Sequence, residues 1–327
     1  MSGKHEKERQ IEWQISKMLC NMPLILTDYY YNLIDSGKSC ATAQKYLYGV
    51  IQFAKFTYGS VVKEDFYLSV TSNRINRYID SFRTINADGK TGDASSSSKA
   101  NSWTALNSFF QFLVPDYISV NPVSSIKRPK MEKISKVVFL TPEEMTGIFE
   151  NIITRASVKQ LNRDLSLFKL GFATGLQVSD IVQIDIDDLD LSHNQIRIEE
   201  SGNLHDNVIV GENLKKQISL WLKDREKFFC NAPTNALFVS QENKRLSTRS
   251  IRDLLEKYAD GATDKHISPD VMRRTCAMNL YQKTGDICLC AKQLRHKDIS
   301  TTLRYLGLQD EKEEKQQKAV DILDDLI

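Results

Sequence analysis

The stretch Leu294-Arg295-His296-Lys297-Asp298-Ile299-Ser300-Thr301-Thr302-Leu303-Arg304-Tyr305 determines how the rest of the chain is interpreted. It places a histidine nine residues before a tyrosine, with a pair of threonines between them. A tyrosine in a helical segment ordinarily packs against its neighbours. The pattern around Tyr305 instead makes its phenol a candidate nucleophile, so the groups that would serve such a nucleophile have to be sought elsewhere in the chain.

This stretch resembles the signature LGHxxIxTTxxY of the tyrosine recombinase (phage integrase) family. In that family the tyrosine attacks a DNA phosphate, the histidine lies beside it, and the protein becomes joined to the 3′-phosphate. The resemblance therefore implies that Tyr305 is the nucleophile and that His296 is a neighbouring catalytic group. It implies no cofactor and no metal, because the phosphotyrosine retains the energy of the broken bond.

Two other segments resemble family motifs but differ from them at catalytic positions. Residues 173–181 are similar to the box TGLRxSEL, with Gln177 in place of the first arginine. Residues 268–275 are similar to SPHxLRRT, which assigns Arg273 to the second arginine and Asp270 to the histidine position. A guanidinium binds two phosphate oxygens and keeps its charge, whereas a glutamine brings no charge. A carboxylate about 4 Å from a phosphate oxygen repels it by roughly 4 kcal/mol at an effective dielectric constant near 20.

The family also carries a lysine on a β-hairpin, in a GKGxK turn, as the general acid for the departing 5′-oxygen. The corresponding turn in this chain, residues 200–206, contains no lysine. His205 is a candidate substitute, although a lone histidine in a turn is more often a solvated side chain. His266 stands four residues before Asp270 and is a second, equally weak candidate for that surface.

A net charge of +2 is too small to indicate a nucleic-acid partner, so the distribution of the cations carries that argument. Residues 125–136 hold five cations and one anion without apolar periodicity, which predicts an extended basic linker or, alternatively, a solvated loop. Four further cations open a predicted helix at residues 244–252 and lie either on DNA or on a solvated face. The candidate DNA-binding residues are Lys127, Arg128, Lys130, Arg245, Arg249 and Arg252.

The length of 327 residues favours two domains, and helical periodicity divides the chain accordingly. Apolar residues at three- and four-residue intervals predict amphipathic helices over 42–56 and 103–113, with another at 72–82. The small polar residues of 86–98 predict a loop that cannot pack. These features resemble the all-helical core-binding domain of the family. The predicted organisation is an N-terminal extension (1–20), a helical core-binding domain (21–124), a basic linker (125–138), a catalytic-like domain (139–309) and a C-terminal helix (310–327).

The second half predicts a mainly helical domain with a small β-sheet, an α+β arrangement that the resemblance also implies. A capping pattern at 140–144 marks its first helix. Polar and apolar residues alternate at 195–199, residues 201–203 offer turn chemistry, and the apolar residues 208–210 can pair back, which predicts a β-hairpin within 188–210. Further helices are expected at 165–175, 214–223, 247–258, 269–283 and 287–294.

Other features limit the class of protein. The first ten residues are charged, and no stretch approaches the roughly 18 uncharged apolar residues of a membrane span, which favours a cytoplasmic protein. The six cysteines lack metal-ligand spacing and are expected to be reduced structural thiols. The tail 311–327 ends in an apolar helical stripe that either docks on a neighbouring protomer, as the resemblance implies, or packs on its own domain.

Two functions remain open at this stage, and a third interpretation, an unrelated helical scaffold, has little support. In the first, the chain binds double-stranded DNA at the nucleoid and performs site-specific strand transfer through a 3′-phosphotyrosine, within a homo- or hetero-tetramer. In the second, it is a catalytically silent relative that binds DNA and assists or regulates an intact tyrosine recombinase.

Overall fold

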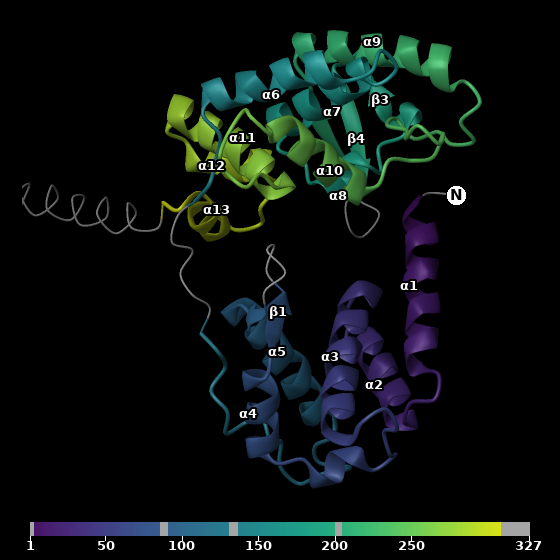
Figure 1. Ribbon diagram of the computed structural model, residues 1–327, viewed down its shortest axis with the longest axis vertical. Helices are drawn as coiled ribbons and strands as arrows, with labels where there is room; N and C mark the ends of the chain where they lie inside the picture. The colour runs from purple at the N-terminus through teal and green to yellow at the C-terminus, as the bar shows by residue number, and fades with distance from the viewer. Residues whose placement is uncertain (1–2, 86–90, 131–136, 200–204, 309–327) are drawn as a thin grey trace, which may run out of the picture. The chain divides into compact units, whose positions relative to one another are not determined.

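The computed structural model describes residues 3–85, 91–130, 137–199 and 205–308, and the chain divides into two units after Ser135 (Figure 1). The described elements of the first unit are α1 (Gly3–Leu19), α2 (Leu24–Asp35), α3 (Cys40–Tyr58), the short 3-10 helix η1 (Phe66–Ser69), α4 (Ser72–Asp80), β1 (Arg83–Ile85), β2 (Thr91–Asp93) and α5 (Ser96–Phe112). Those of the second unit are α6 (Pro142–Arg155), α7 (Leu161–Thr174), α8 (Val178–Ile181), the 3-10 helix η2 (Ile186–Asp188), β3 (Leu189–Asp190), β4 (Gln195–Glu199), β5 (His205–Ile209), α9 (Glu212–Phe229), α10 (Thr248–Ala259), α11 (Pro269–Thr284), α12 (Ile287–Gln293) and α13 (Ile299–Leu306).

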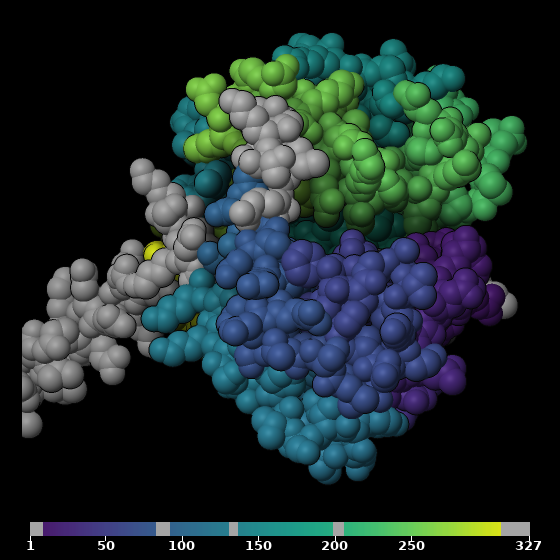
Figure 2. All heavy atoms as spheres, turned by 60° about the horizontal axis from the view of Figure 1, so that its bottom comes forward, coloured from purple at the N-terminus to yellow at the C-terminus, as the bar shows by residue number. Residues whose placement is uncertain are grey.

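Aromatic side chains fill the core of the first unit. Phe109 of α5 lies 5.2 Å, centroid to centroid, from Tyr29 of α2 and stacks at 5.8 Å on Phe66. Phe53 of α3 packs edge-on against Phe110 and Tyr78. The space-filling view shows that side chains fill the spaces that the ribbon diagram leaves between the helices of this unit (Figure 2). The apolar positions that predicted the helices at 42–56 and 103–113 therefore lie at the centre of the unit.

The first unit departs from the sequence prediction in two places. It is not purely helical, because β1 and β2 pair antiparallel with Thr84 opposite Gly92. The prediction that residues 86–98 form an unpacked loop is wrong from Thr91 onwards: residues 91–93 form β2, and Ser95 caps α5 by accepting a hydrogen bond from the Ser98 amide at 3.2 Å. Short polar residues cap helices as readily as they form loops. Residues 86–90 lie outside the described part.

The first unit extends beyond both ends of the predicted core-binding domain. Helix α1 occupies the expected N-terminal extension, and its Ile15 is buried in the core of the unit. At the other end, Ile126 is buried, and its carbonyl accepts a hydrogen bond from the indole of Trp103 at 3.1 Å. An extended basic segment therefore cannot begin before Lys127. Residues 131–136 and the predicted C-terminal helix 310–327 lie outside the described residues.

Helix α7 is the central element of the second unit and packs against α6, α9 and α11. The predicted start of α6 is confirmed, because Thr141 and Glu144 form a capping box. The predicted hairpin is also confirmed and forms part of a three-stranded antiparallel sheet in the order β3-β4-β5, with Ile196 opposite Val208. None of the described helices has the length and apolar character that crossing a membrane requires.

A fully buried polar network ties α7 to α10. Arg163 donates to Asp164 at 2.7 Å and to the carbonyl of Val239 at 3.0 Å, while the hydroxyl of Tyr258 donates to Asp164 at 2.6 Å. Arg163 and Asp164 are 2% and 0% exposed, so neither can replace a lost partner with water. Buried charges of this kind are tolerated only while they are paired.

Removing the central carboxylate of this network is expected to destabilise the second unit. Asp164→Ala leaves a buried guanidinium and a buried hydroxyl without their partner, which should lower the free energy of unfolding by about 3–5 kcal/mol. The matched control is Asp260→Ala, which breaks the exposed ion pair with Arg155 and should cost less than about 1 kcal/mol. Urea denaturation followed by far-UV circular dichroism measures both. Equal losses in the two variants would contradict the network's role.

Candidate active site

Tyr305 lies in the last turn of α13 and points its hydroxyl at the start of α11. Asp298 caps α13 by accepting a hydrogen bond from the Ser300 amide at 2.9 Å. The Tyr305 hydroxyl donates to the carboxylate of Asp270 at 2.8 Å and lies 2.9 Å from the carbonyl oxygen of the same residue. The proposed nucleophile and the residue at the altered histidine position are therefore in direct contact.

The surroundings of Tyr305 hold its phenol in the neutral form. Partial burial is the largest cause that raises its pKa above the ordinary value of 10, and the negative charge of Asp270 and the hydrogen bond to it raise it further. The charges of Arg273 and Arg274 act in the opposite direction but do not outweigh these causes. At neutral pH the hydroxyl keeps its proton, so an attack by its oxygen requires an acceptor for that proton.

The carboxylate of Asp270 does not stand alone as a negative charge. Arg274, one helical turn later in α11, donates to its second oxygen at 2.8 Å. The guanidinium of Arg274 also lies over the ring of Tyr305, with 4.7 Å between its central carbon and the ring centroid. The repulsion expected between Asp270 and a phosphate is thus offset locally by a cation that the sequence analysis did not single out. The i, i+4 spacing was the available signal.

Arg273 is a buried guanidinium that joins three segments. It donates to the carbonyl of Gly175 at 2.6 Å and to the carbonyl of Leu294. Gly175 ends α7 at φ 64°, and a Cβ there would lie 3.1 Å from the Leu294 side chain. A glycine is therefore needed for both the conformation and the close approach. Through these contacts Arg273 fixes the chain just before Gln177 and just before His296.

His296 lies against Tyr305. The two rings are nearly perpendicular with 5.6 Å between centroids, and Nδ1 of His296 is 2.9 Å from the hydroxyl of the fully buried Thr302. Burial, followed by the charge of Arg273, lowers the pKa of His296 below 6.5. The imidazole is therefore neutral at pH 7. Thr302 belongs to the threonine pair of the quoted stretch and sets the orientation of the ring.

The altered first-arginine position is exposed. Gln177 is the N-cap residue of α8, and its amide oxygen lies 3.4 Å from the Ser179 hydroxyl. A cation from a different segment reaches the same short helix, because Arg295 donates to Asp180 at 2.9 Å. The sequence analysis missed Arg295, although the family signature has a glycine at that place.

The other candidate site residues lie in different situations. His205 begins β5, and its side chain is outside the described part of the chain. His266 is exposed, and none of the hydrogen bonds found among the described residues joins it to Asp270 or Tyr305. Arg249 and Arg252 are exposed on α10. Arg245 instead donates to Asp185 and, at 2.8 Å, to the carbonyl of Val182, so the protein already engages its guanidinium.

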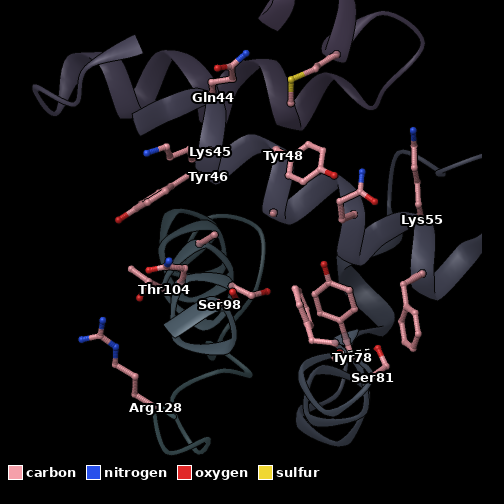
Figure 3. Close-up of a pocket in the computed structure, with 18 residues that line it drawn as sticks. Gln44, Lys45, Tyr46, Tyr48, Lys55, Tyr78, Ser81, Ser98, Thr104 and Arg128 are labelled. Carbon is pink, nitrogen blue, oxygen red and sulfur yellow. Dashed lines mark hydrogen bonds between the residues drawn. The ribbon is translucent and has the colours of Figure 1, made fainter. Parts of the chain in front are cut away.

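The first unit has a groove between α3, α4 and α5 (Figure 3). Three exposed cations line it: Lys45 and Lys55 from α3, and Arg128 from the segment after α5. The aromatic rings of Tyr48 and Tyr78 lie between them, among hydroxyl and amide side chains. Cations interleaved with polar and aromatic groups are suited to a phosphate backbone. The sequence analysis identified Arg128 but not the two lysines.

Comparisons with known proteins identify relatives of this chain. A model of the phage integrase family matches residues 138–312. The tyrosine recombinase XerC of Psychromonas ingrahamii is 29% identical over 212 residues, which are 64% of this chain and 69% of that protein. The tyrosine recombinase XerD of Staphylococcus epidermidis is 28% identical over 214 residues, 64% of this chain and 72% of that protein.

Solved structures share the fold. The XerH site-specific recombinase in a pre-cleavage complex with its difH substrate superposes with a TM-score of 0.64 and 18% identity, over 82% of this chain and 78% of that chain. A lambda integrase dimer bound to a COC′ core site superposes with a TM-score of 0.62 and 17% identity, over 87% and 95% of the two chains. At these identities the likeness establishes the fold alone.

The lowered pKa of His296 gives an expected pH dependence of stability. Between the folded pKa and the unfolded value near 6.5, the unfolded chain binds more protons, so stability falls as the pH is lowered through this window. His296→Gln should remove part of this loss. Melting temperatures of the wild type and the variant at intervals from pH 7.5 to pH 5 measure it, with the exposed His266→Gln as control. A wild-type profile that His296→Gln leaves unchanged would contradict the assignment.

Proposed function

The chain belongs to the phage integrase family, and on this premise we propose that it cuts and rejoins duplex DNA at specific sites through a 3′-phosphotyrosine formed by Tyr305. One observation carries the proposal: the Tyr305 hydroxyl is hydrogen bonded to the Asp270 carboxylate, near the charge of Arg273 and against the ring of His296. A nucleophile within reach of a proton acceptor and next to cationic and neutral donors is the arrangement that phosphoryl transfer requires.

In the proposed reaction each residue has a separate task. The Tyr305 oxygen attacks the phosphorus, its proton passes to the Asp270 oxygen 2.8 Å away, and the bond from phosphorus to the 5′-oxygen breaks. The departing 5′-oxygen takes up a proton from water. Arg273, which has N–H donors beyond the two that bond to the carbonyls of Gly175 and Leu294, and a neutral N–H of His296 bind the nonbridging oxygens as charge builds on them. Asp270 then acts as the general base, a role that the sequence analysis did not foresee for it.

DNA binding in this proposal uses both units. The groove cations Lys45, Lys55 and Arg128 contact phosphates in the first unit, together with Lys127 and Lys130. Arg249 and Arg252 do so in the second unit, whereas Arg245 acts indirectly by holding Asp185. The XerH and lambda integrase structures contain DNA, and the lambda structure contains a dimer. Assembly of this chain on duplex DNA, as a homo- or hetero-tetramer, extends the proposal.

A second function is favoured by specific residues. Gln177 supplies no charge, and residues 200–206 supply no lysine to act as the acid. A chain with these changes would bind DNA and assist an intact recombinase without cutting. The contact between Tyr305 and Asp270 favours the first function, because a protein that only binds DNA does not need a proton acceptor at its tyrosine.

Covalent capture separates these two functions. Duplexes selected from a random library by binding to the protein are nicked close to the bound centre, so that the released strand cannot rejoin. We expect a covalent protein–DNA adduct in the wild type and none in Tyr305→Phe. Asp270→Asn should slow its formation by about 10²- to 10⁴-fold, the usual contribution of a general base.

The controls for this experiment are Asp264→Asn and Asp270→His. The first changes an exposed carboxylate that has no place in the proposed site and should leave the rate unchanged. The second restores the residue type of the family motif and should retain adduct formation. Sequence-selective binding without a Tyr305-dependent adduct would refute strand transfer and support the silent relative.

The groove of the first unit predicts a change in the salt dependence of binding. Each phosphate contact contributes about 0.9 to the slope of log K against log salt concentration. Replacing Lys45, Lys55 and Arg128 together by alanine should therefore reduce this slope by about 2.7. The control replaces the exposed Lys216, Lys223 and Lys227 of α9 and should leave the slope unchanged. Fluorescence anisotropy of the selected duplex between low and moderate salt measures both. Equal slopes for the two triple variants would remove the groove from the interface.

A further inference from the structure

Arg295 has a backbone conformation that an arginine rarely adopts. Its φ is +54°, and the other non-glycine residues with positive φ in the described part of the chain are asparagines, at 21, 194 and 243. Arg295 follows the C-cap of α12, where its amide bonds to the carbonyl of Lys292 and the next amide bonds to that of Ala291, both at 2.9 Å. This is a Schellman motif, which favours glycine at this position.

Other helices of the same unit place glycine there. Helices α7, α11 and α13 end on Gly175, Gly285 and Gly307, each with a positive φ. Glycine is also the residue of the family signature at the position of Arg295. An arginine in this conformation costs stability without any benefit to the turn, and such strain is typically kept where the side chain has a function.

The side chain of Arg295 is largely buried and only partly paired. One terminal nitrogen donates to Asp180 at 2.9 Å, and the side chain is 16% exposed. The other terminal nitrogen, Nη1, is buried without a hydrogen-bond partner among the described residues. An unpaired buried donor on a cation costs free energy unless it meets an anion. This second observation, independent of the backbone strain, leaves the guanidinium with a donor that lacks an acceptor.

The position of this guanidinium matches the charge that the site lacks. Asp180 lies in α8, the short helix that Gln177 caps, so Arg295 reaches the element that carries the first arginine in the family motif. Arg273 holds the carbonyl of Leu294, the residue directly before Arg295. The guanidinium groups of Arg273 and Arg295 are thus held near one another. Burial lowers the pKa of Arg273, and the positive charge of Arg295 lowers it further. A bound phosphate would relieve that repulsion.

We propose that Arg295 supplies the guanidinium that position 177 lacks, and that it binds a nonbridging oxygen of the scissile phosphate together with Arg273. The inference rests on the proposed function, since it assigns the ligand of the same site. In this arrangement the positive charge comes from the residue that follows α12 and not from the N-cap residue of α8. The left-handed backbone conformation of Arg295 directs its guanidinium toward α8.

Phosphate-ethylation interference tests the contact without any need for cleavage. Randomly ethylated copies of the selected duplex carry a neutral ester at one phosphate each, and the Tyr305→Phe protein is used throughout. We expect one phosphate in each half-site whose ethylation weakens binding by at least fivefold. This interference should become weaker in Arg295→Asn, where only Arg273 still holds that phosphate, because asparagine tolerates the conformation but brings no charge. The other interfering positions should remain. An unchanged pattern in Arg295→Asn would overturn the proposal.

Covalent capture with Tyr305 present gives a second, separable result. Arg295→Asn should slow adduct formation by about 10²- to 10³-fold, as expected for loss of one transition-state donor. Adding Gln177→Arg to the Arg295→Asn variant should raise the rate of adduct formation at least tenfold. Arg295→Gly, which also relieves the backbone strain, should show the same defect with a melting temperature within a few degrees of the wild type. A rate for Arg295→Asn or Arg295→Gly within threefold of the wild type would overturn the assignment.

The two experiments fail independently. A wild type without a Tyr305-dependent adduct, combined with an interference position that depends on Arg295, would refute strand transfer and retain the phosphate contact. A wild type that forms the adduct, with no interference position that depends on Arg295, would retain strand transfer and refute the role of Arg295.

Discussion

The guanidinium of Arg273 is the constraint on which the site depends. It bonds to the carbonyls of Gly175 and Leu294, and so it holds the ends of α7 and α12 against α11. A single planar group with several fixed donors can satisfy two carbonyls at once, which a lysine could not do with the same directionality. Gln177, Arg295 and His296 all follow within two residues of these carbonyls. The candidate catalytic side chains are therefore positioned by the same interaction that packs the helices.

The departures from the family motifs form a connected set in three dimensions. The carboxylate at 270 introduces a negative charge, and Arg274 offsets it from one turn away. The neutral residue at 177 removes a positive charge, and Arg295 returns one to the same helix. Considered one position at a time along the sequence, these changes read as losses. In three dimensions each change has a compensating cation nearby. The residues around Tyr305 come from α8, α11, α12 and α13, so the compensating cations are distant in sequence from the changed positions or lie one turn away.

The sequence could predict much of the fold for local reasons. Amphipathic spacing located α3 and α5, and the Thr141 capping box located α6, because both signals lie within one element. It failed at residues 91–98, where short polar residues pair in a strand and cap a helix. For the site, motif spacing led to Tyr305, Arg273 and His296. Arg274 and Arg295 were missed, because their importance lies in contacts with Asp270 and Asp180 across the fold.

The hydrogen bond between Tyr305 and Asp270 has a consequence for the balance between cut and sealed DNA. In the proposed mechanism the carboxylate holds the phenolic proton while the covalent intermediate exists. When the 5′-hydroxyl attacks the phosphotyrosine, the same oxygen can return that proton to the departing phenolate. The Asp270 carboxylate therefore accepts the phenolic proton during cutting and donates it during sealing. The direction of the reaction would be decided by which DNA end occupies the site, because the protonation chemistry favours neither outcome.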